Sequence, residues 1–533
     1  MPAFTGAAAP RLALAAALAA LAALPAGYLL ASALPVLGEG GWLAHLASTT
    51  LPRQAANSLR IAIEASLVAF AVGALPAIVV ARFDFPGRGL VSVLALLPLL
   101  FAPWVTASTW TVAFSADFFS SRLALSIQHG LATAPYLFVV FRIAASRVPR
   151  AFGEAAAALG HDAGSRLLRV HLPLYAVPIA AGLMIVFAQS VGDYAASSLL
   201  GVQTLSLGLG NLWLASQRWD VAAIGSTLLI VPALLLVAAA AWASTSLMSR
   251  NPVPPAAAAV SRRPLSRPAA AALLAWSIGW SLPGFVVPEL LTLRWAWSRW
   301  DPSRMASLPA DVGHSIATAT ASAATVTLLC LLIAVVLRAG GATRHAERLP
   351  WLFLVNWFLP SMVLALAFVA MTRDGSLAAQ WLGPLRDTRG LVVVAEALRF
   401  MPLALLPMLD ALRRTPPAMI EAARAHGAGP LRARAVAYAG HVVPALVLGA
   451  ALVFMESVKA LDLSLMLQPF GYSSLALKPY GLGRFQVMDR AAPWVLASQL
   501  LMLAPLVLLA WRMRRLDPSV SSTPRRGSAD RRG

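Results

Sequence analysis

The chain has 533 residues, of which 59% are hydrophobic and 12% charged, and its mean hydropathy is +0.73. Soluble domains carry about 25% charged residues, so this composition excludes a water-soluble protein. The formal net charge of +20 would suggest nucleic-acid binding in a soluble protein. Here the basic residues lie between apolar segments, as expected for the loops of a membrane protein. We therefore expect a lipid bilayer around the chain and no nucleic-acid partner.

The first apolar stretch follows Arg11 and runs to Leu37. The apolar core of a secretory signal peptide has about 7 to 15 residues, and this stretch is about twice as long. We therefore expect a first membrane helix here, with a cleaved signal peptide as the alternative. The single cysteine, Cys330, lies in an apolar run and excludes a disulfide or a cysteine-based metal site.

Apolar segments long enough to cross a bilayer recur along the whole chain, because about 20 apolar residues span ~30 Å of hydrocarbon. The fold class that they predict is an all-α polytopic membrane protein with about twelve transmembrane helices. If the N-terminus and every second connection are cytoplasmic, that side holds about twice as many arginines as the other. Both termini are then cytoplasmic. The predicted spans are 12–36, 57–81, 89–113, 124–145, 175–199, 226–248, 268–290, 314–337, 349–371, 390–411, 443–467 and 491–511.

An internal repeat divides the chain. The segment 154–191 matches 421–458 without a gap, at a constant offset of 267 residues, with ten of 38 positions identical. A repeat of this length predicts two homologous six-helix halves. The repeated residues that we single out are Glu154, Ala155, Ala156 and Gly160 in the first copy and Glu421, Ala422, Ala423 and Gly427 in the second.

The repeat sets the domain boundaries. The first transmembrane half covers 1–250, with a polar loop near 147–173, and the second covers 269–515, with its loop near 413–444. A Pro-, Ala- and Arg-rich segment, 251–268, is the predicted cytoplasmic linker between them. The basic residues 516–533 form a cytoplasmic tail that we expect to be disordered.

Each polar loop carries a short amphipathic segment of about ten residues, which is too short to span the bilayer. Glu154 and Glu421 are expected in the first helical turn, where a carboxylate complements the helix dipole. The alanines let another surface approach closely, and Gly160 and Gly427 permit a sharp turn. Two equivalent short helices of this kind, one in each loop, predict that a two-fold symmetric partner binds them outside the membrane.

The first loop, with Leu172 and Pro173 after its Glu-Ala-Ala and Gly, resembles the EAA loop of ABC importer permeases. Two further stretches, Arg82 to Arg88 and Gln468 to Tyr472 followed by Leu475 and Ala476, are similar to fused two-half iron(III)-type permeases. The resemblance implies a permease subunit for ferric iron in the bacterial cell inner (plasma) membrane. Import of thiamine, polyamine or phosphonate by the same class remains open. One departure is Gly440, which stands where the family has the second loop's proline.

The resemblance also implies partners. Two copies of an ABC ATPase subunit would bind the two loops from the cytoplasm and would hold ATP and magnesium, and a periplasmic or extracytoplasmic solute-binding protein would deliver the substrate. The chain has no phosphate-binding loop of the form G-x-x-x-x-G-K-[ST], so we expect no enzyme activity and no cofactor in this chain. The alternative is an ion-gradient-driven secondary transporter, which also uses repeats and ionisable groups in the membrane.

Ionisable residues inside spans are costly and usually face the interior of the bundle. Glu396 with Arg399, and Glu456 with Lys459, are spaced as neutralised structural pairs on one helix face. Asp193 and Glu456 are also candidates for the substrate pathway, and no metal site is expected. Trp295, Trp297 and Trp300 are predicted to form an interfacial aromatic belt, with contact to a delivery protein as the alternative. The ionisable residues are Glu64, Asp193, Glu396, Arg399, Glu456, Lys459 and Asp462.

Overall fold

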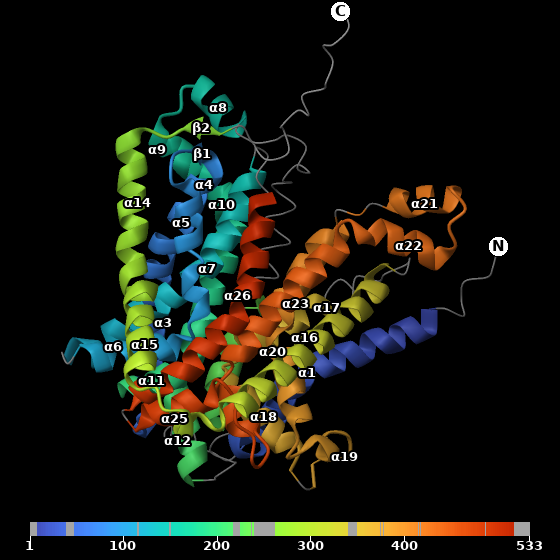
Figure 1. Ribbon diagram of the computed structural model, residues 1–533. Coiled ribbons are helices and arrows are strands. Elements are labelled where there is room, and N and C mark those ends of the chain that lie inside the picture. The colour runs from blue at the N-terminus through green and yellow to red at the C-terminus, as the bar shows by residue number, and fades with distance from the viewer. Residues whose placement is uncertain are drawn as a thin grey trace, which may run out of the picture.

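A computed structural model describes residues 8–38, 47–114, 117–148, 151–216, 224–235, 237–238, 262–338 and 349–515, apart from 374, 377, 414, 416 and 486. The described chain is a helical bundle with one pair of two-residue strands (Figure 1). We refer to residues 8–238 as the first half and to residues 267–515 as the second half. The predicted linker and tail lie largely outside the described residues, since only 262–268 of the linker are described.

The first half begins with one long helix and continues through shorter, frequently broken ones. Four π-helical or 3₁₀ segments, η1 to η4, interrupt or join them. The elements are α1 (Ala8–Gly38), α3 (Leu51–Ala69), η1 (Phe70–Ala74), α4 (Leu75–Arg82), β1 (Phe83–Asp84), α5 (Arg88–Leu94), η2 (Leu97–Leu100), α6 (Pro103–Ala113), η3 (Asp117–Ser120), α7 (Arg122–Arg147), α8 (Ala151–Ala158), α9 (Ala163–Arg166), η4 (Leu167–His171), α10 (Leu172–Gly192), α11 (Ala195–Leu200) and α12 (Leu205–Ser216).

The second half follows the strand β2 (Arg263–Pro264) and repeats much of this order. Its elements are α14 (Arg267–Ser281), η5 (Leu282–Val286), α15 (Val287–Ser298), η6 (Pro302–Met305), α16 (Leu308–Arg338), α17 (Leu349–Phe358), α18 (Ser361–Met371), α19 (Ala379–Leu382), η8 (Gly383–Leu385), α20 (Arg389–Arg413), α21 (Pro417–Ala425), α22 (Pro430–Ala439), α23 (Val442–Lys459), α24 (Asp462–Leu467), α25 (Leu477–Arg484), η9 (Met488–Ala491) and α26 (Ala492–Arg515).

Eight described helices are long and apolar enough to cross a membrane, and the number is 11 if each of three sharply bent helix pairs counts as one span. The protein is therefore a helical, multi-pass membrane protein, as the composition predicts. The predicted span 226–248 corresponds to the shorter apolar helix Ile224–Leu235, and most of the remainder of that span lies outside the described residues.

The bends were not predicted from the hydropathy pattern. The segments Arg88–Leu100 and Pro103–Ala113 meet at 89°, and Leu349–Phe358 and Ser361–Met371 meet at 106°. A proline follows each first segment within three residues, at Pro103 and Pro360, and lacks the N–H that would continue the helix. Two predicted spans are therefore broken helices.

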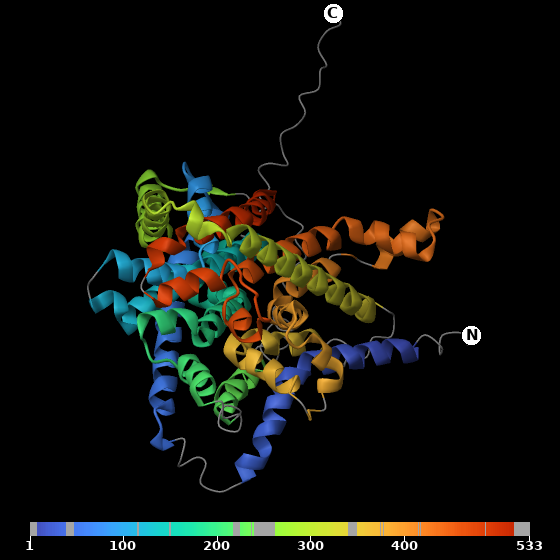
Figure 2. The same ribbon diagram turned by 60° about the horizontal axis from the view of Figure 1, so that its bottom comes forward.

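The two halves exchange their first helices. Helix α1 packs against α17 and α18 of the second half, and α14 packs against α5 of the first. Figures 1 and 2 both show α1 lying along second-half helices. Side-chain hydrogen bonds accompany both exchanges: the Asn356 side chain donates to the Ala22 carbonyl at 2.9 Å, and the Trp276 indole of α14 donates to the Ala71 carbonyl at 3.3 Å. The exchange fastens the halves to each other.

Small residues allow the helices within each half to pack closely. A Cβ atom added at Gly130 of α7 would lie 2.5 Å from the Val68 side chain of α3. A Cβ added at Gly449 of α23 would lie 2.4 Å from the backbone of Ala404 in α20. Glycine is thus required at both crossings, which is typical of helix packing in membranes.

Candidate functional site

The first loop, residues 147–173, holds the helix α8 with Glu154 in its first turn, as expected. Ala155 is exposed and Ala156 is buried, and Pro173 lies in the first turn of α10. Gly160 follows α8 with a φ of +80°, and a Cβ added there would meet nothing within 4 Å. Its backbone conformation, not the space around it, therefore favours glycine.

The linker lies against this loop. Strand β2 pairs in parallel with β1, and the Leu265 N–H donates to the Asp84 carbonyl at 2.9 Å. One step away, the Arg263 guanidinium contacts the Glu154 carboxylate at 2.9 Å, with both side chains more than half exposed. Figure 1 shows α8 next to these strands. Glu154 therefore already has a partner within the chain, which the sequence did not indicate.

The second loop, residues 413–444, is built differently around the same motif. Helix α21 begins at Pro417, so Glu421 lies beyond the first turn, and the expectation that it sits in the first turn is wrong. Proline favours the first position of a helix, and here it starts α21 earlier than the repeat suggests. Ala422 is exposed and Ala423 half-buried, and Gly427 has a φ of +81°.

The helices α21 and α22 pack on each other and extend away from the bundle (Figure 1). Glu421 is exposed, and no described residue bonds to it. At Gly440 the backbone has a φ of −73°, which lies within the range of proline. The departure from the family at this position therefore leaves the backbone conformation compatible with the usual residue.

A cavity of about 100 Å³ lies between the two halves. It is lined where helices break: α10 ends at Gly192 and α11 begins at Ala195, and α23 ends at Lys459 and α24 begins at Asp462. Non-helical backbone at membrane depth is tolerated where it is buried in protein or lines a cavity. The ionisable side chains of the lining are His129, Asp193, Arg399, Glu456, Lys459 and Asp462.

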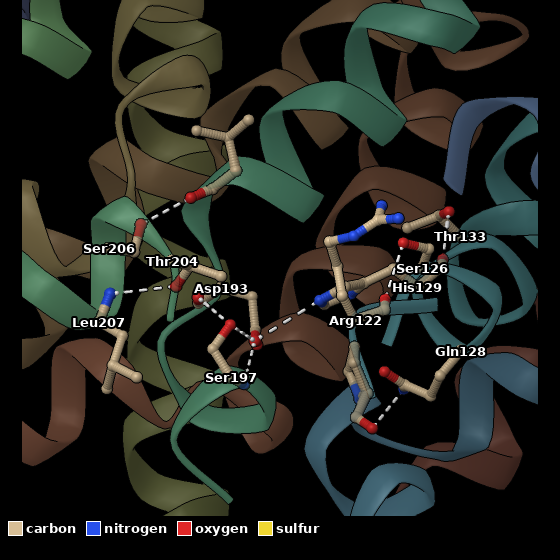
Figure 3. Close-up of polar contacts among 12 residues, drawn as sticks. Arg122, Ser126, Gln128, His129, Thr133, Asp193, Ser197, Thr204, Ser206 and Leu207 are labelled. Carbon is tan, nitrogen blue, oxygen red and sulfur yellow. Dashed lines mark hydrogen bonds and ion pairs between the residues drawn. The ribbon is translucent and has the colours of Figure 1, made fainter. Parts of the chain in front are cut away.

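Asp193 lies in this lining, as its candidate role requires. Its carboxylate accepts the backbone N–H of Ser197 at 3.0 Å and so caps the short helix α11. The His129 Nε2 atom lies 3.5 Å from the same carboxylate (Figure 3). Asp193 is thus held in place by its own half.

Glu456 lies in the same cavity, and it forms the predicted structural pair. Its carboxylate contacts the Lys459 ammonium group one helical turn later at 2.5 Å, and both side chains are about a tenth exposed. It also accepts a hydrogen bond from the Tyr136 hydroxyl of the first half. The residue is therefore both part of an ion pair and part of the cavity lining.

The predicted pairing of Glu396 with Arg399 is wrong. The Glu396 carboxylate accepts hydrogen bonds from Ser322, at 2.8 Å, and from Ser457. The Arg399 guanidinium instead donates to the backbone carbonyls of Asn356 at 3.2 Å and Trp357 at 2.5 Å, and to that of Leu359.

These carbonyls lie at the broken end of α17, where they have no intrahelical partner. Because Arg399 is 2% exposed, its charge is balanced by these dipoles inside the bundle. The sequence shows the arginine but not the helix end that it caps. The repeated Phe-x-Pro at 101–103 and 358–360 was the signal that could have revealed both bends.

The other sequence-derived candidates are more peripheral. Glu64 pairs with Arg122 at 2.5 Å within the first half. Trp297 and Trp300, at the end of α15, are largely exposed, so the aromatic belt stays a prediction. Among the described residues, no group of three His, Cys, Asp or Glu side chains could hold a metal ion.

The fold and the cavity define a multi-pass membrane protein whose two halves enclose a polar, broken-helix site. Residues 65–249 and 347–522 match the model of the binding-protein-dependent transport system inner membrane component. The chain belongs to this family and is a permease component of an ABC importer, not an enzyme.

One characterised relative is a probable molybdenum ABC transporter permease protein from Haloferax volcanii. It is 28% identical over 196 residues, which cover 33% of this chain and 73% of that protein. No solved structure matches the chain.

Proposed function

We propose that this chain is the complete membrane-spanning pathway of its importer, with two homologous halves in one polypeptide. A pair of ABC ATPase subunits would bind the first and second loops, and an extracytoplasmic solute-binding protein would deliver substrate to the opposite side. The observation that carries this proposal is the recurrence of a short exposed helix with Glu-Ala-Ala and a left-handed glycine, at Gly160 and Gly427, in both halves.

Both loops lie on the upper side of the bundle in Figure 1, so one pair of ATPase subunits could reach both. This side is the cytoplasmic one in our proposal, and the chain is multi-pass in the inner membrane with both termini in the cytoplasm. ATP binding would draw the ATPase subunits, and with them the two loops, together. A ligand can shift a conformational equilibrium only through its differential affinity for the two states, and this linkage would couple ATP to the cavity.

The substrate that we propose is ferric iron, on the resemblance of the stretches around Arg82 and Gln468 to iron-type permeases. Molybdate is the second candidate, because a probable molybdenum permease is similar to part of the chain. The cavity would pass the substrate and not retain it, since the described residues offer no metal-holding group. Asp193 and Glu456 would line the pathway.

Uptake into proteoliposomes tests this function. The chain is reconstituted with its ATPase and binding protein, ATP is enclosed on the ATPase side, and radioactive ferric iron and molybdate are offered separately. We expect ATP-dependent iron uptake that survives an ionophore. Uptake that needs no ATPase and collapses with the ionophore would instead identify an ion-driven carrier. Uptake of molybdate, thiamine, a polyamine or a phosphonate in place of iron would correct the substrate alone.

A further inference from the structure

Two hydrogen bonds to charged side chains cross from one half to the other beside the central cavity. The Tyr136 hydroxyl of α7 donates to the Glu456 carboxylate of α23. The Arg399 guanidinium of α20 lies 3.5 Å from the Gln189 amide oxygen of α10. Asp462, at the start of α24, and Asp193 of the first half line the same cavity. The cavity is therefore closed by polar contacts as well as by packing.

The charges of these contacts are distributed unequally. Glu456 and Arg399 both belong to the second half, whereas the first half supplies a hydroxyl and an amide. The ion pair of Glu456 with Lys459 falls within the second half, and the His129 ring lies beside Asp193 within the first.

Because of this distribution, separating the two halves requires little free energy. When the halves part, Glu456 keeps Lys459 on its own helix, and Arg399 keeps the carbonyls of α17. An unpaired charge in a buried site is strongly unfavourable, and here neither Glu456 nor Arg399 would be left unpaired. Only hydrogen bonds between a charged and a neutral group would break, and these are individually modest.

The contacts lie far from the two loops. Gln189 is 17 residues beyond the first residue of α10, and Glu456 is 14 residues beyond that of α23. At ~1.5 Å per residue, Glu456 lies roughly 21 Å along α23, and Gln189 lies roughly 17 Å beyond the 61° bend that separates Ala176 from Pro178. A bilayer core is about 30 Å thick, so the contacts lie in the part of the membrane remote from α8 and α21.

The backbones of the two halves touch at the same level. A Cβ atom added at Gly192, the last residue of α10, would lie 3.3 Å from the Cα and 3.8 Å from the Cβ of Pro360, the residue at the α17–α18 bend. No space for a substrate remains between these two residues. The broken ends of a first-half helix and a second-half helix thus meet directly.

We propose that Tyr136, Gln189, Arg399 and Glu456 form a latch that closes the pathway on the side opposite the two loops, and that opening toward that side breaks the latch while Glu456 and Arg399 keep their partners within the second half. This inference rests on the proposed importer function. It assigns the Tyr136 hydroxyl and the Gln189 amide, neither of which the sequence had indicated, a role in holding the resting conformation.

A matched pair of substitutions tests the latch. Tyr136→Phe removes a hydroxyl that bonds to a carboxylate across the halves, and Ser126→Ala removes a hydroxyl that bonds to the Glu64 carboxylate, at 2.7 Å, within the first half. We expect Tyr136→Phe to raise the ATPase rate of the complex without binding protein roughly tenfold or more, the shift in equilibrium that loss of one hydrogen bond to a charged group gives. Ser126→Ala should leave the rate unchanged. Equal rates for both variants would overturn the latch.

A disulfide provides a second, independent measurement. Gly192→Cys and Pro360→Cys are combined with Cys330→Ser, which removes the single native cysteine. The 3.8 Å separation of the two Cβ positions is suited to a disulfide. We expect the bond to form without nucleotide, to form at least several-fold more slowly with a non-hydrolysable ATP analogue, and to block transport until a reductant is added.

The two hypotheses fail in different ways. If the reduced cysteine variant and the wild type both lack ATP-dependent uptake, the proposed function is wrong. If the reduced variant transports and the oxidised variant transports equally well, or if cross-linking is the same with and without the nucleotide analogue, the latch is wrong while the importer function stands.

Discussion

The two halves of the protein share much of their order of helices, but different contacts hold their helix bends and their loops. In the first half, the bend before α6 is held by one neutral group, because the Gln128 amide donates to the Pro103 carbonyl. In the second half, the bend between α17 and α18 is held by the Arg399 guanidinium on three carbonyls. For the loops, the additional contact is in the first half instead. The linker contacts the first loop through Arg263, whereas the second loop extends from the bundle. The repeated sequence therefore produces the same fold in both halves, but the interactions that stabilise equivalent bends and loops differ.

The largest expected effect is a loss of stability when the contacts that hold the two helix bends are removed. Arg399→Met should leave three carbonyls at the end of α17 without partners and should lower the free energy of unfolding by about 3 to 5 kcal/mol. Gln128→Leu should remove one hydrogen bond to a carbonyl that also bonds within α6, and should cost less than about 1 kcal/mol. Thermal unfolding in detergent compares the two variants. Equal losses would show that the two bends are fastened equally, contrary to our comparison.

The two turn glycines should behave alike in spite of the differences around them. Gly160→Ala and Gly427→Ala each place a side chain on a backbone with positive φ, +80° and +81°, in open space. The cost should be about 1 to 2 kcal/mol in each loop and should come from conformation alone. Hydrogen exchange of α8 and α21 measures it. Gly440→Ala, at a φ of −73° and also in open space, is the control that should change little.

The two glutamates should contribute unequally to binding of the ATPase. Glu421 has no bonded partner among the described residues, whereas Glu154 already contacts Arg263. Glu421→Ala should therefore weaken ATPase binding more than Glu154→Ala, by about 1 kcal/mol or roughly fivefold. Affinity of the detergent-solubilised chain for the ATPase subunit measures the difference. A stronger effect of Glu154→Ala would show that the linker contact assists coupling.

The smallest effect is expected at the linker itself. Arg263 and Glu154 are largely exposed, so Arg263→Ala should change overall stability by less than about 1 kcal/mol. The effect of Arg263→Ala should instead appear in ATPase binding. When Arg263 is absent, Glu154→Ala and Glu421→Ala should weaken ATPase binding by more similar amounts. Arg304→Ala, which breaks an exposed pair with Asp301, is the matched control and should leave the difference intact.

Hydropathy predicted the membrane fold because about 20 apolar residues are needed for each span wherever the helices pack. It could not predict the bends at Pro103 and Pro360, since a broken helix in a protein interior is as apolar as a straight one. The exchange of α1 and α14 between the halves was also beyond reach, because hydropathy does not say which helix packs against which.

The candidate site was partly predictable. The pairing of Glu456 with Lys459 followed from their spacing on one helix face, whereas the same spacing misled for Glu396 and Arg399. The helix end at Phe358 offers Arg399 carbonyl oxygens, and such an end is created by tertiary structure. Tyr136 was missed because its partner Glu456 lies 320 residues away in the sequence. The turn at Gly160 and Gly427, by contrast, depends on local backbone chemistry and was visible in the repeat.

The measurement that tests the central claim most directly is copurification of the ATPase subunit with the Glu154→Ala, Glu421→Ala double variant, together with ATP-driven uptake. If the two loops are the attachment points of the ATPase, the variant should insert and fold in the membrane as the wild type does but lose ATPase association and transport. If the double variant binds the ATPase and transports at the wild-type level, the two loops do not couple ATP to this permease as we propose.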